Sequence, residues 1–413
     1  MAATRTPVAL RDPEFRGLWT AQTLSRVGDQ LARVALIVLV FQSTGSAAAA
    51  SAAYAVTMVP WLIGGPLLGW LGDRYPRRAV MISCDLASAG LIAAMAVPGQ
   101  PLPALYVLLF AATLLAGPFG AARSALVRDV FPDDDRYAAA TALTSVTGQF
   151  AQVAGFAGGG LLAGLTTPRQ ALLLDAATFV VSAILVRLTV TRRPAPRGPA
   201  GAALPSRAMT AGVRLVFGDS RLRRLTSYAW LASLHTVPAG VVAPYVADLG
   251  GGSAGVGLLL ASVAFGTALS MIVVSRWVPA ERRLRLMEPL ALLAGAPLVL
   301  CAFHPGLVLT AAIWALAGAG SGYQLAANVA FVRAVPDAHR AQAFGVVAAG
   351  LVAGQGFGVL AAGALASVLA PALVVAVAGT LAALLALLLW ANAEPDRRPR
   401  RPSRDDVRAS RVR

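Results

Sequence analysis

The chain has 413 residues, of which 57% are hydrophobic and only 13% charged, and its mean hydropathy of +0.68 lies well above that of soluble globular proteins. This composition excludes an ordinary soluble domain and predicts a membrane protein. The formal net charge of +16 comes from 35 arginines without a lysine, and they fall between the apolar runs, which favours a role in membrane topology over nucleic-acid binding.

Apolar runs long enough to cross a membrane recur along the whole chain. A helix of about 20 residues spans the roughly 30 Å of hydrocarbon in a bilayer. Because backbone polar groups find no water there, each span must satisfy them within itself, which favours helices. The predicted spans cover residues 17–41, 49–72, 79–97, 102–126, 139–165, 169–190, 222–246, 253–277, 284–303, 305–332, 341–367 and 371–391. We therefore predict an all-α membrane protein with twelve transmembrane helices.

The first span carries three charges inside an apolar run. The stretch from Ser25 to Arg33 reads SRVGDQLAR, and Arg26, Asp29 and Arg33 are spaced three and four residues apart, so they share one helix face. At about 1.5 Å of rise per residue, Asp29 lies roughly 18 Å from Gly17, near the middle of the bilayer. A charge exposed to lipid there costs about 2.5 to 3.5 kcal/mol. We expect the three side chains to face a central cavity or a partner helix, held by each other and by water.

Two roles for these three charges remain open. In the functional interpretation, Asp29 binds and releases a proton and so couples proton flow to substrate movement. In the structural interpretation, the three residues are permanently charged and hold the helix in register, because a nearby arginine such as Arg26 or Arg33 favours the ionised carboxylate.

Arginines alternate between the connections that join the spans. They are frequent after the second, fourth, sixth, eighth and tenth spans, and Arg169 is the only arginine of the opposite loops. By the positive-inside rule, the arginine-rich side is cytoplasmic and both termini lie on it. The first span is too long and too charged for a cleaved signal peptide. We expect a multi-pass protein of the inner (plasma) membrane with both termini in the cytoplasm.

The sequence contains an internal repeat. Residues 117–130 read GPFGAARSALVRDV, and residues 322–335, 205 positions further on, read GYQLAANVAFVRAV, with seven of fourteen positions identical. An even number of spans separates the copies, so we predict two parallel six-helix pseudo-repeats with a cavity between them, an arrangement found in secondary transporters. The predicted domains are an N-terminal bundle (1–190), a cytoplasmic linker (191–221), a C-terminal bundle (222–392) and a basic cytoplasmic tail (393–413).

Uncharged polar side chains interrupt several of the apolar spans. Gln149, Gln324 and Asn328 can line the central cavity, although we expect most polar residues of this kind to form hydrogen bonds between helices. His235 in the seventh span is a further candidate for proton binding. A lone histidine in a span is more often structural.

Other kinds of chemistry have little support in the sequence. The isolated Cys84 and Cys301 predict neither a disulfide nor a metal site. Without lysine there is no phosphate-binding P-loop, which leaves an ion gradient as the energy source. Asp85 and Asp175 lie in the third and sixth spans. For both we favour a role in helix packing over a functional role. We expect no enzymatic activity, no metal and no cofactor.

The end of the second span resembles a known transporter motif. Residues 69–78 read GWLGDRYPRR, a pattern of glycine, aspartate and arginine that is similar to motif A of the major facilitator superfamily. The stretches SRVGDQLARVAL, PWLIGGPLLGWLGDRYPRR and GPFGAARSALVRDVFPDDD look like the branch that includes multidrug, siderophore and macrolide efflux proteins. This resemblance implies the major facilitator fold. The chain departs from the pattern at Val278, where a second copy would repeat Asp73, and it lacks the fifth-helix proline of the antiporter signature.

The motif implies a conformational latch on the cytoplasmic side. Its glycines allow two helices to approach closely. Asp73 can then face a helix amino terminus, while an arginine reaches a carboxylate of the fourth span, and these contacts would break in the opposite conformation. Alternatively, the arginines act only as topology signals. The residues assigned to the latch are Gly69, Gly72, Asp73, Arg74, Arg77, Arg78 and Asp129.

Together with the resemblance, these features predict a monomeric secondary active transporter. We expect proton-coupled efflux of an amphipathic small molecule by alternating access, with membrane lipid around the protein and no nucleic-acid partner. Because the spans are rich in Ala, Val, Leu and Gly, we expect few formal charges in the cavity and a substrate that is not highly charged. The alternatives are an importer or uniporter of a small solute and, if the interface is dry, a non-transporting membrane sensor or assembly protein.

Overall fold

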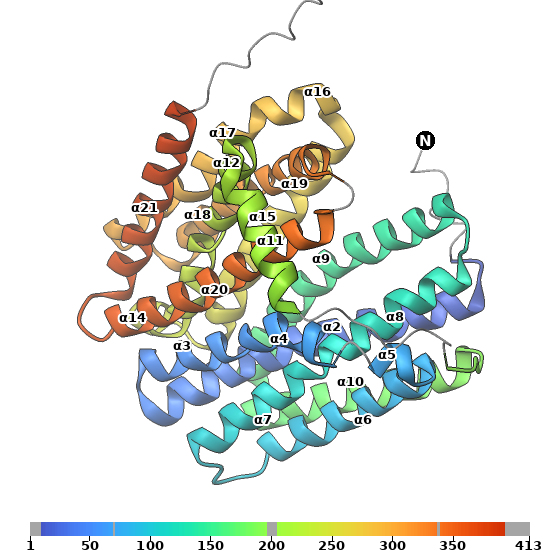
Figure 1. Ribbon diagram of the computed structural model, residues 1–413. Helices are drawn as coiled ribbons and strands as arrows, with labels where there is room; N and C mark the ends of the chain where they lie inside the picture. The colour runs from blue at the N-terminus through green and yellow to red at the C-terminus, as the bar shows by residue number, and fades with distance from the viewer. Residues whose placement is uncertain (1–9, 69–70, 196–204, 337–338, 393–413) are drawn as a thin grey trace, which may run out of the picture.

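The chain folds into helices that cover all twelve of the predicted apolar runs (Figure 1). The computed structural model describes residues 10–68, 71–195, 205–336 and 339–392, and it contains no strand within these ranges. Seven helical segments are long and apolar enough to cross a membrane, namely Arg77–Met95, Leu102–Val130, Pro168–Thr189, Ser253–Trp277, Leu284–Phe303, Gln342–Leu365 and Pro371–Ala391. The molecule therefore has the helices of a multi-pass membrane protein, and membrane crossing by the other five runs stays a prediction.

The first half of the chain, residues 10–195, occupies the lower and right part of the molecule in Figure 1. Its helices are α2 (Pro13–Thr44), α3 (Ala47–Val56), α4 (Val59–Leu68), α5 (Leu71–Arg74), α6 (Arg77–Met95), α7 (Leu102–Leu114), α8 (Ala116–Val130), α9 (Asp134–Leu165) and α10 (Pro168–Thr189). Local sequence sets the ends of α2. The Asp12 carboxylate caps its first turn by accepting hydrogen bonds from the backbone N–H groups of Glu14 and Phe15 at 2.9 and 3.0 Å. Gly45 ends the helix with φ of +64°, a conformation that glycine adopts without strain.

The second half, residues 205–392, lies in the upper left part of the same view. Its helices are α11 (Pro205–Gly218), α12 (Ser220–Leu231), η2 (Leu234–Thr236), α13 (Val237–Gly240), α14 (Val242–Asp248), α15 (Ser253–Trp277), α16 (Ala280–Arg283), η3 (Leu284–Leu286), α17 (Met287–Gly295), η4 (Ala296–Phe303), α18 (Leu307–Gly320), α19 (Tyr323–Ala334), α20 (Arg340–Leu365) and α21 (Pro371–Ala391). The predicted run 222–246 is divided into α12, η2, α13 and α14, with Pro238 and Pro244 inside the short pieces. Proline lacks the backbone donor that a continuous helix needs.

The segment predicted as a cytoplasmic linker is partly helical. Its part from Pro205 to Gly218 forms α11, which packs against α20 and α12. Proline at the first helical position is compatible with a helix, since its missing N–H would have no partner there. Gly212 permits the close contact with α20, because a Cβ at this position would lie 2.6 Å from the Gln342 carbonyl oxygen.

Helix α2 occupies a central position in the first half. It packs against α9, α10 and α3. Glycines of α9 lie directly on its backbone: a Cβ at Gly155 would stand 2.6 Å from the Val27 carbonyl oxygen, and one at Gly159 would stand 3.0 Å from Leu31 Cα. Such close helix contacts are typical of small residues in membrane proteins. They fix which face of α2 is turned away from α9.

The two halves meet through α9 with α15 and through α3 with α20. Gly160 of α9 and Gly257 of α15 pack backbone to backbone. At the second contact, the Ser51 hydroxyl of α3 donates a hydrogen bond to the carbonyl oxygen of Gly240 at 2.7 Å, and Gly363 of α20 packs on the same serine. Both contacts lie where α9 and α20 end and where α3 and α15 begin. The arginine-rich connections are at the opposite ends of these helices.

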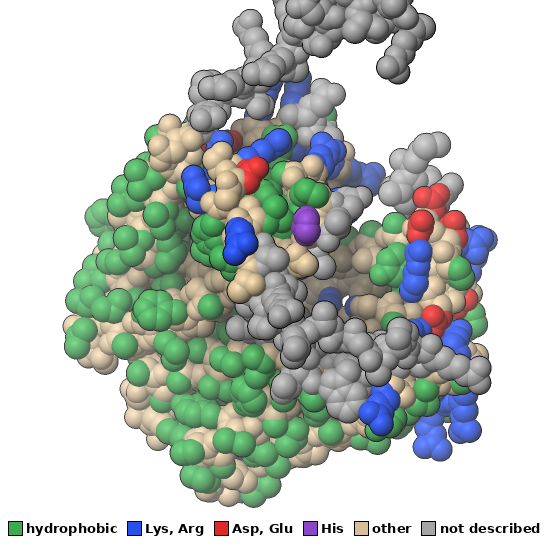
Figure 2. Space-filling model, viewed as in Figure 1, with side chains coloured by type: hydrophobic (Ala, Val, Ile, Leu, Met, Phe, Trp, Pro, Cys, Tyr) green, Lys and Arg blue, Asp and Glu red, His purple; other side chains and the backbone are tan. Residues whose placement is uncertain are grey.

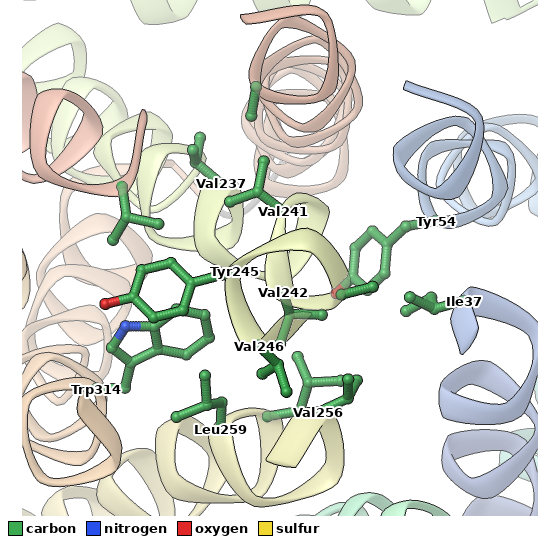
Figure 3. Close-up of a cluster of buried hydrophobic side chains, with 14 of the residues drawn as sticks. Ile37, Tyr54, Val237, Val241, Val242, Tyr245, Val246, Val256, Leu259 and Trp314 are labelled. Atoms are coloured by element: carbon green, nitrogen blue, oxygen red, sulfur yellow. The ribbon is translucent and has the colours of Figure 1, made fainter. Parts of the chain in front are cut away.

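A cluster of apolar side chains fills the space between the halves at this end. Figure 3 shows Ile37 and Tyr54 of the first half directed toward Val242 and Val256 of the second. The rings of Tyr245 and Trp314 extend the cluster with their centroids 5.8 Å apart. Removing this much apolar surface from water stabilises the contact. The halves are therefore joined by a dry, packed seal on the side away from the arginine-rich connections.

Candidate functional site

A cavity of about 960 Å³ lies on the other side of this seal. Its wall comes almost entirely from the first half, from α2, α3, α4, α6, α7, α8, α9 and α10 and the turns between them, to which α20 of the second half adds Val352 and Gln355. Figure 2 shows the surface hollowed between the two halves. Six arginine and aspartate side chains line the cavity, namely Arg26, Asp29, Arg33, Asp85, Arg123 and Asp175. The expectation of few formal charges is therefore wrong, because the charged residues of these helices face inward beside apolar lining residues such as Ile37 and Ile92.

Asp29 is exposed to the cavity from the middle of α2. The predicted orientation of the three charges toward a central cavity agrees with this placement. The predicted ion pairs among them are not formed: neither Arg26 nor Arg33 lies within 4.0 Å of the Asp29 carboxylate, and this carboxylate has no hydrogen bond to any residue of the described ranges. Asp29 is thus left to water and to whatever enters the cavity.

The two arginines of α2 turn away from Asp29 toward neighbouring helices. The Arg26 guanidinium lies against α9 at Gly148, where a Cβ would collide with it. The Arg33 guanidinium lies over the ring of Tyr54 at 5.4 Å from its centroid, a favourable cation–π geometry. Arg33 therefore forms the floor of the cavity directly above the apolar seal.

Arg123 is a cavity residue that the sequence did not reveal. Its position near the end of the fourth predicted span suggested a topology signal, yet it lies about two turns inside α8 and lines the cavity. Its Nη1 donates a hydrogen bond to Oε1 of Gln22 on α2 at 2.5 Å. The seven residues of helix that follow it were the available clue, because they place its Cα about 10 Å from the end of α8.

Asp85 and Asp175 belong to the cavity wall but are withdrawn from its surface. Their exposed fractions are 2% and 0%. The Ser182 hydroxyl donates to Oδ2 of Asp85 at 2.7 Å, and the Thr178 hydroxyl donates to Oδ1 of Asp175 at 3.3 Å. The second oxygen of Asp175 is buried without a partner in the described part of the chain. Gly28 of α2 makes room for this carboxyl, since a Cβ there would collide with it.

Of the polar residues predicted to line the cavity, the structure places only some in its wall. Gln149 lines it, whereas Gln324, Asn328 and His235 do not. The reason is the position of their helices: α19 and η2 pack within the second half, and almost all of the wall comes from the first. The His235 ring lies edge-on to Tyr323 with centroids 5.9 Å apart, and both of its nitrogens are buried without a hydrogen-bond partner among the described residues.

A second, smaller site lies among the arginines at the ends of α6 and α8. Arg77 and Asp129, both assigned to the latch, form an ion pair there. They line a pocket of about 890 Å³ together with Arg78, Arg128 and Arg193. Arg78 donates to the backbone carbonyl of Arg187 on α10. The pair therefore connects the third and fourth predicted spans.

The remaining latch residues are less informative. Gly69 lies outside the described residues, and so does the side chain of Asp73, while Gly72 belongs to the short helix α5. Arg74 ends the short helix α5 and is exposed. The contact expected between Asp73 and a helix amino terminus accordingly stays a prediction.

The start of α2 is tied to the segment that follows α10. The Glu14 carboxylate accepts hydrogen bonds from the backbone N–H of Thr191 at 3.3 Å and from both terminal nitrogens of Arg193. These bonds and the charge of Glu14 raise the pKa of Arg193 from its ordinary value. This connection closes the first half into a ring at its arginine-rich end.

Comparison with known proteins identifies the relatives of this architecture. The family model of the Major Facilitator Superfamily matches residues 18–243 and 225–413, which together cover nearly the whole chain. Macrolide efflux protein A of Streptococcus pyogenes is 31% identical over 98 residues, which are 23% of this chain and 24% of that protein. An uncharacterized MFS-type transporter of Bacillus subtilis, YfiS, is 27% identical over 184 residues, 43% of this chain and 44% of the relative. The chain thus matches less than half the length of either curated relative.

Solved structures share the fold at low sequence identity. A POT family transporter in complex with a thioalcohol-conjugated peptide has a TM-score of 0.74 at 14% identity, covering 91% of this chain and 95% of that one. The nucleoside transporter NupG has a TM-score of 0.74 at 14% identity, covering 92% of this chain and all of the other. Both likenesses concern the arrangement of helices alone.

Proposed function

Since the chain belongs to the Major Facilitator Superfamily and is a multi-pass membrane transporter rather than an enzyme, we propose that it is a proton-coupled exporter of an amphipathic small molecule in the inner membrane. The two halves would rock about the cavity, so that it opens alternately to either side of the membrane. Both termini would lie in the cytoplasm, the working unit would be the monomer in its lipid surroundings, and neither a cofactor nor a nucleic acid would take part.

The carboxylate of Asp29 carries this proposal. It is exposed to the cavity from the middle of a helix, and no cation of the described chain lies within ion-pair distance of it. An ionisable group at membrane depth is costly and is kept mainly where it handles ions or substrates. A carboxylate open to water from one side can bind a proton there and release it after the cavity opens to the other side.

The cavity also bears on the alternatives. A non-transporting sensor would need no water-filled space between its halves, whereas this chain encloses about 960 Å³ lined by charges. Export in place of import is supported by the partial likeness to macrolide efflux protein A. The seal at one end and the cavity at the other fit one of the two conformations that alternating access requires.

Everted membrane vesicles with an imposed pH gradient test the proposal. Asp29→Asn keeps the shape of the side chain and removes its protonatable group, so gradient-driven transport should be lost while the yield of folded protein stays at the wild-type level. Asp248→Asn is the matched control, because Asp248 is exposed at the end of α14 and outside the cavity. Undiminished transport by Asp29→Asn would rule out this residue as the coupling site.

A further inference from the structure

Only some of the charged side chains that line the cavity are accessible to a molecule inside it. Three aspartates and three arginines line it, and their formal charges cancel. Asp85 and Asp175 are buried to 2% and 0% exposure and bonded to hydroxyl groups, so they offer no surface to a ligand. Asp29 is exposed, and the arginines are half-buried. The accessible set is therefore one carboxylate and three guanidiniums.

These guanidiniums have few partners within the protein. Each carries five N–H donors in a planar fork that suits a carboxylate, sulfonate or phosphate group. Arg123 has one acceptor, Gln22 Oε1, and Arg33 has the face of Tyr54. Arg26 has no hydrogen-bond acceptor in the described residues and rests on the backbone of α9 at Gly148. Donors that face an aqueous cavity without protein acceptors are available to an anionic group.

Asp29 offers the opposite chemistry within the same space. Its neighbours three and four residues away are Arg26 and Arg33, yet both guanidiniums turn toward other helices and leave its oxygens unpaired. An exposed carboxylate with no cation of the described chain within ion-pair distance can bind an ammonium group. The same helix α2 thus presents a site for a cation between two sites for anions.

Besides the charged and uncharged polar residues, the cavity has an apolar surface. This apolar part includes Ile37 of α2, Met58 just before α4, Ile92 of α6 and Phe179 of α10. Such surfaces take up the hydrocarbon or aromatic body of a ligand, while a few polar groups fix its orientation. The size of about 960 Å³ falls in the range of cavities that hold drug-sized molecules.

We propose that the cavity binds amphipathic zwitterions, with the acidic group on the arginines around Arg26, the ammonium group on Asp29 and the apolar body on the wall beyond. This inference rests on the proposed transport function, since it names the class of its substrate. It also explains exchange: a proton and the ammonium group compete for the same Asp29 oxygens, so that binding of one releases the other. The three guanidiniums outnumber the single carboxylate, so the acidic group contributes more to binding than the ammonium group.

Three fluorescent probes with one dansyl body separate these contributions. Nε-dansyl-lysine is a zwitterion, 6-(dansylamino)hexanoic acid is an anion and dansylcadaverine is a cation, all with similar aliphatic arms. Their binding to the purified full-length protein in nanodiscs is measured by the rise in dansyl fluorescence, with empty nanodiscs as background. We expect the zwitterion to bind most tightly, then the anion, then the cation. Equal affinity for all three, or an anion that binds as tightly as the zwitterion, would overturn the proposal.

Variants then assign each charge. Arg26→Gln should lower the affinity for the zwitterion and for the anion about tenfold, the loss expected for one charge-assisted hydrogen bond. The affinity for the cation should stay unchanged. Asp29→Asn should lower the affinity for the zwitterion by a similar factor without lowering the affinity for the anion. Arg214→Gln, at an exposed position of α11, is the control. A zwitterion affinity unchanged in Arg26→Gln contradicts the proposal, and Arg33→Gln replaces this variant if it aggregates.

These binding measurements need no gradient. If they give the expected pattern while everted vesicles show no transport, the proposed function fails and the binding class stands. If transport depends on Asp29 while the probes bind equally well whatever their charge, the proposed binding class fails and the proposed function stands.

Discussion

Gly160 of α9 and Gly257 of α15 pack so closely that a Cβ on either would lie 2.5 to 2.6 Å from the Cα of the other. No side chain fits at either position, and the two backbones touch. The contact lies at the sealed end of the molecule, near the last residue of α9, Leu165, and the first of α15, Ser253. Alternating access would require these two helices to separate there.

A larger residue at Gly160 should therefore hold the sealed end open. Gly160→Val adds a group that must displace α15, and overpacking of this kind costs about 1 to 3 kcal/mol. We expect slower transport and a longer distance between spin labels placed at Thr166 and Gly252, measured by pulsed electron spin resonance. Gly158→Val is the control, because a Cβ at Gly158 meets nothing within 4 Å. Wild-type label distances in Gly160→Val would show that this contact does not govern the seal.

The ion pair of Arg77 with Asp129 should behave as a latch that depends on both partners. The side chains are 22% and 35% exposed, so solvent screens part of the attraction and we expect about 1 kcal/mol from the pair. Arg77→Ala and Asp129→Ala should each slow transport, and the exchanged pair Arg77→Asp with Asp129→Arg should restore part of the rate. The initial rate of uptake into everted vesicles measures both effects.

The control for this latch is a neighbouring pair with less burial. Arg128 and Asp134 are 2.7 Å apart but 47% and 89% exposed, so removing either charge should change the rate little. Equal losses at the two pairs would mean that the arginines act through the net charge of this surface, as topology signals do.

Gly28 should be essential for the packing of α2 on α10. A Cβ at this position collides with the side chains of Asp175 and Thr178, which are hydrogen-bonded to each other. Gly28→Ala is expected to lower the stability by about 1 to 3 kcal/mol through overpacking. The fraction of protein that stays monodisperse after graded heating in detergent reports the loss.

Gly90 in α6 gives the matching substitution for this test. A Cβ there meets nothing within 4 Å, so Gly90→Ala should leave stability unchanged or raise it by up to about 1 kcal/mol, since alanine favours helix over glycine. If Gly28→Ala is as stable as Gly90→Ala, α2 can move away from α10 without cost and the Asp175 carboxyl is not confined as described.

The orientation in the membrane can be tested with single cysteines. The protein's own Cys84 and Cys301 are buried, so they should react little with a membrane-impermeant maleimide. Thr166→Cys, between α9 and α10, should be labelled from outside intact cells, and Ser220→Cys, at the start of α12, only after the cells are opened. The opposite pattern would invert the predicted topology and place both termini outside.

The positions of the helices, and which residues share a helix face, follow from the sequence. Apolar runs, caps such as Asp12 and terminators such as Gly45 act within a few residues, so the sequence alone predicts helical structure in each of the twelve runs. The spacing of Arg26, Asp29 and Arg33 likewise placed them on one face, because the helix period is a local property. The partnership of Arg77 with Asp129 could be anticipated only through the family resemblance.

Tertiary structure decided which of these charges meet. Asp29 stands without its two neighbouring arginines because contacts with α9 and Tyr54 draw the guanidiniums away. Arg123 enters the cavity and His235 stays out of it because of how α8 and η2 pack against their neighbours, which the sequence of each segment does not specify. The sequence therefore determined the helices, and its arginine pattern predicts the side of the membrane on which the charged connections lie. The packing of α2 between α9 and α10 determined the wall of the cavity, since side chains from helices far apart in the sequence converge there only after those helices have come together.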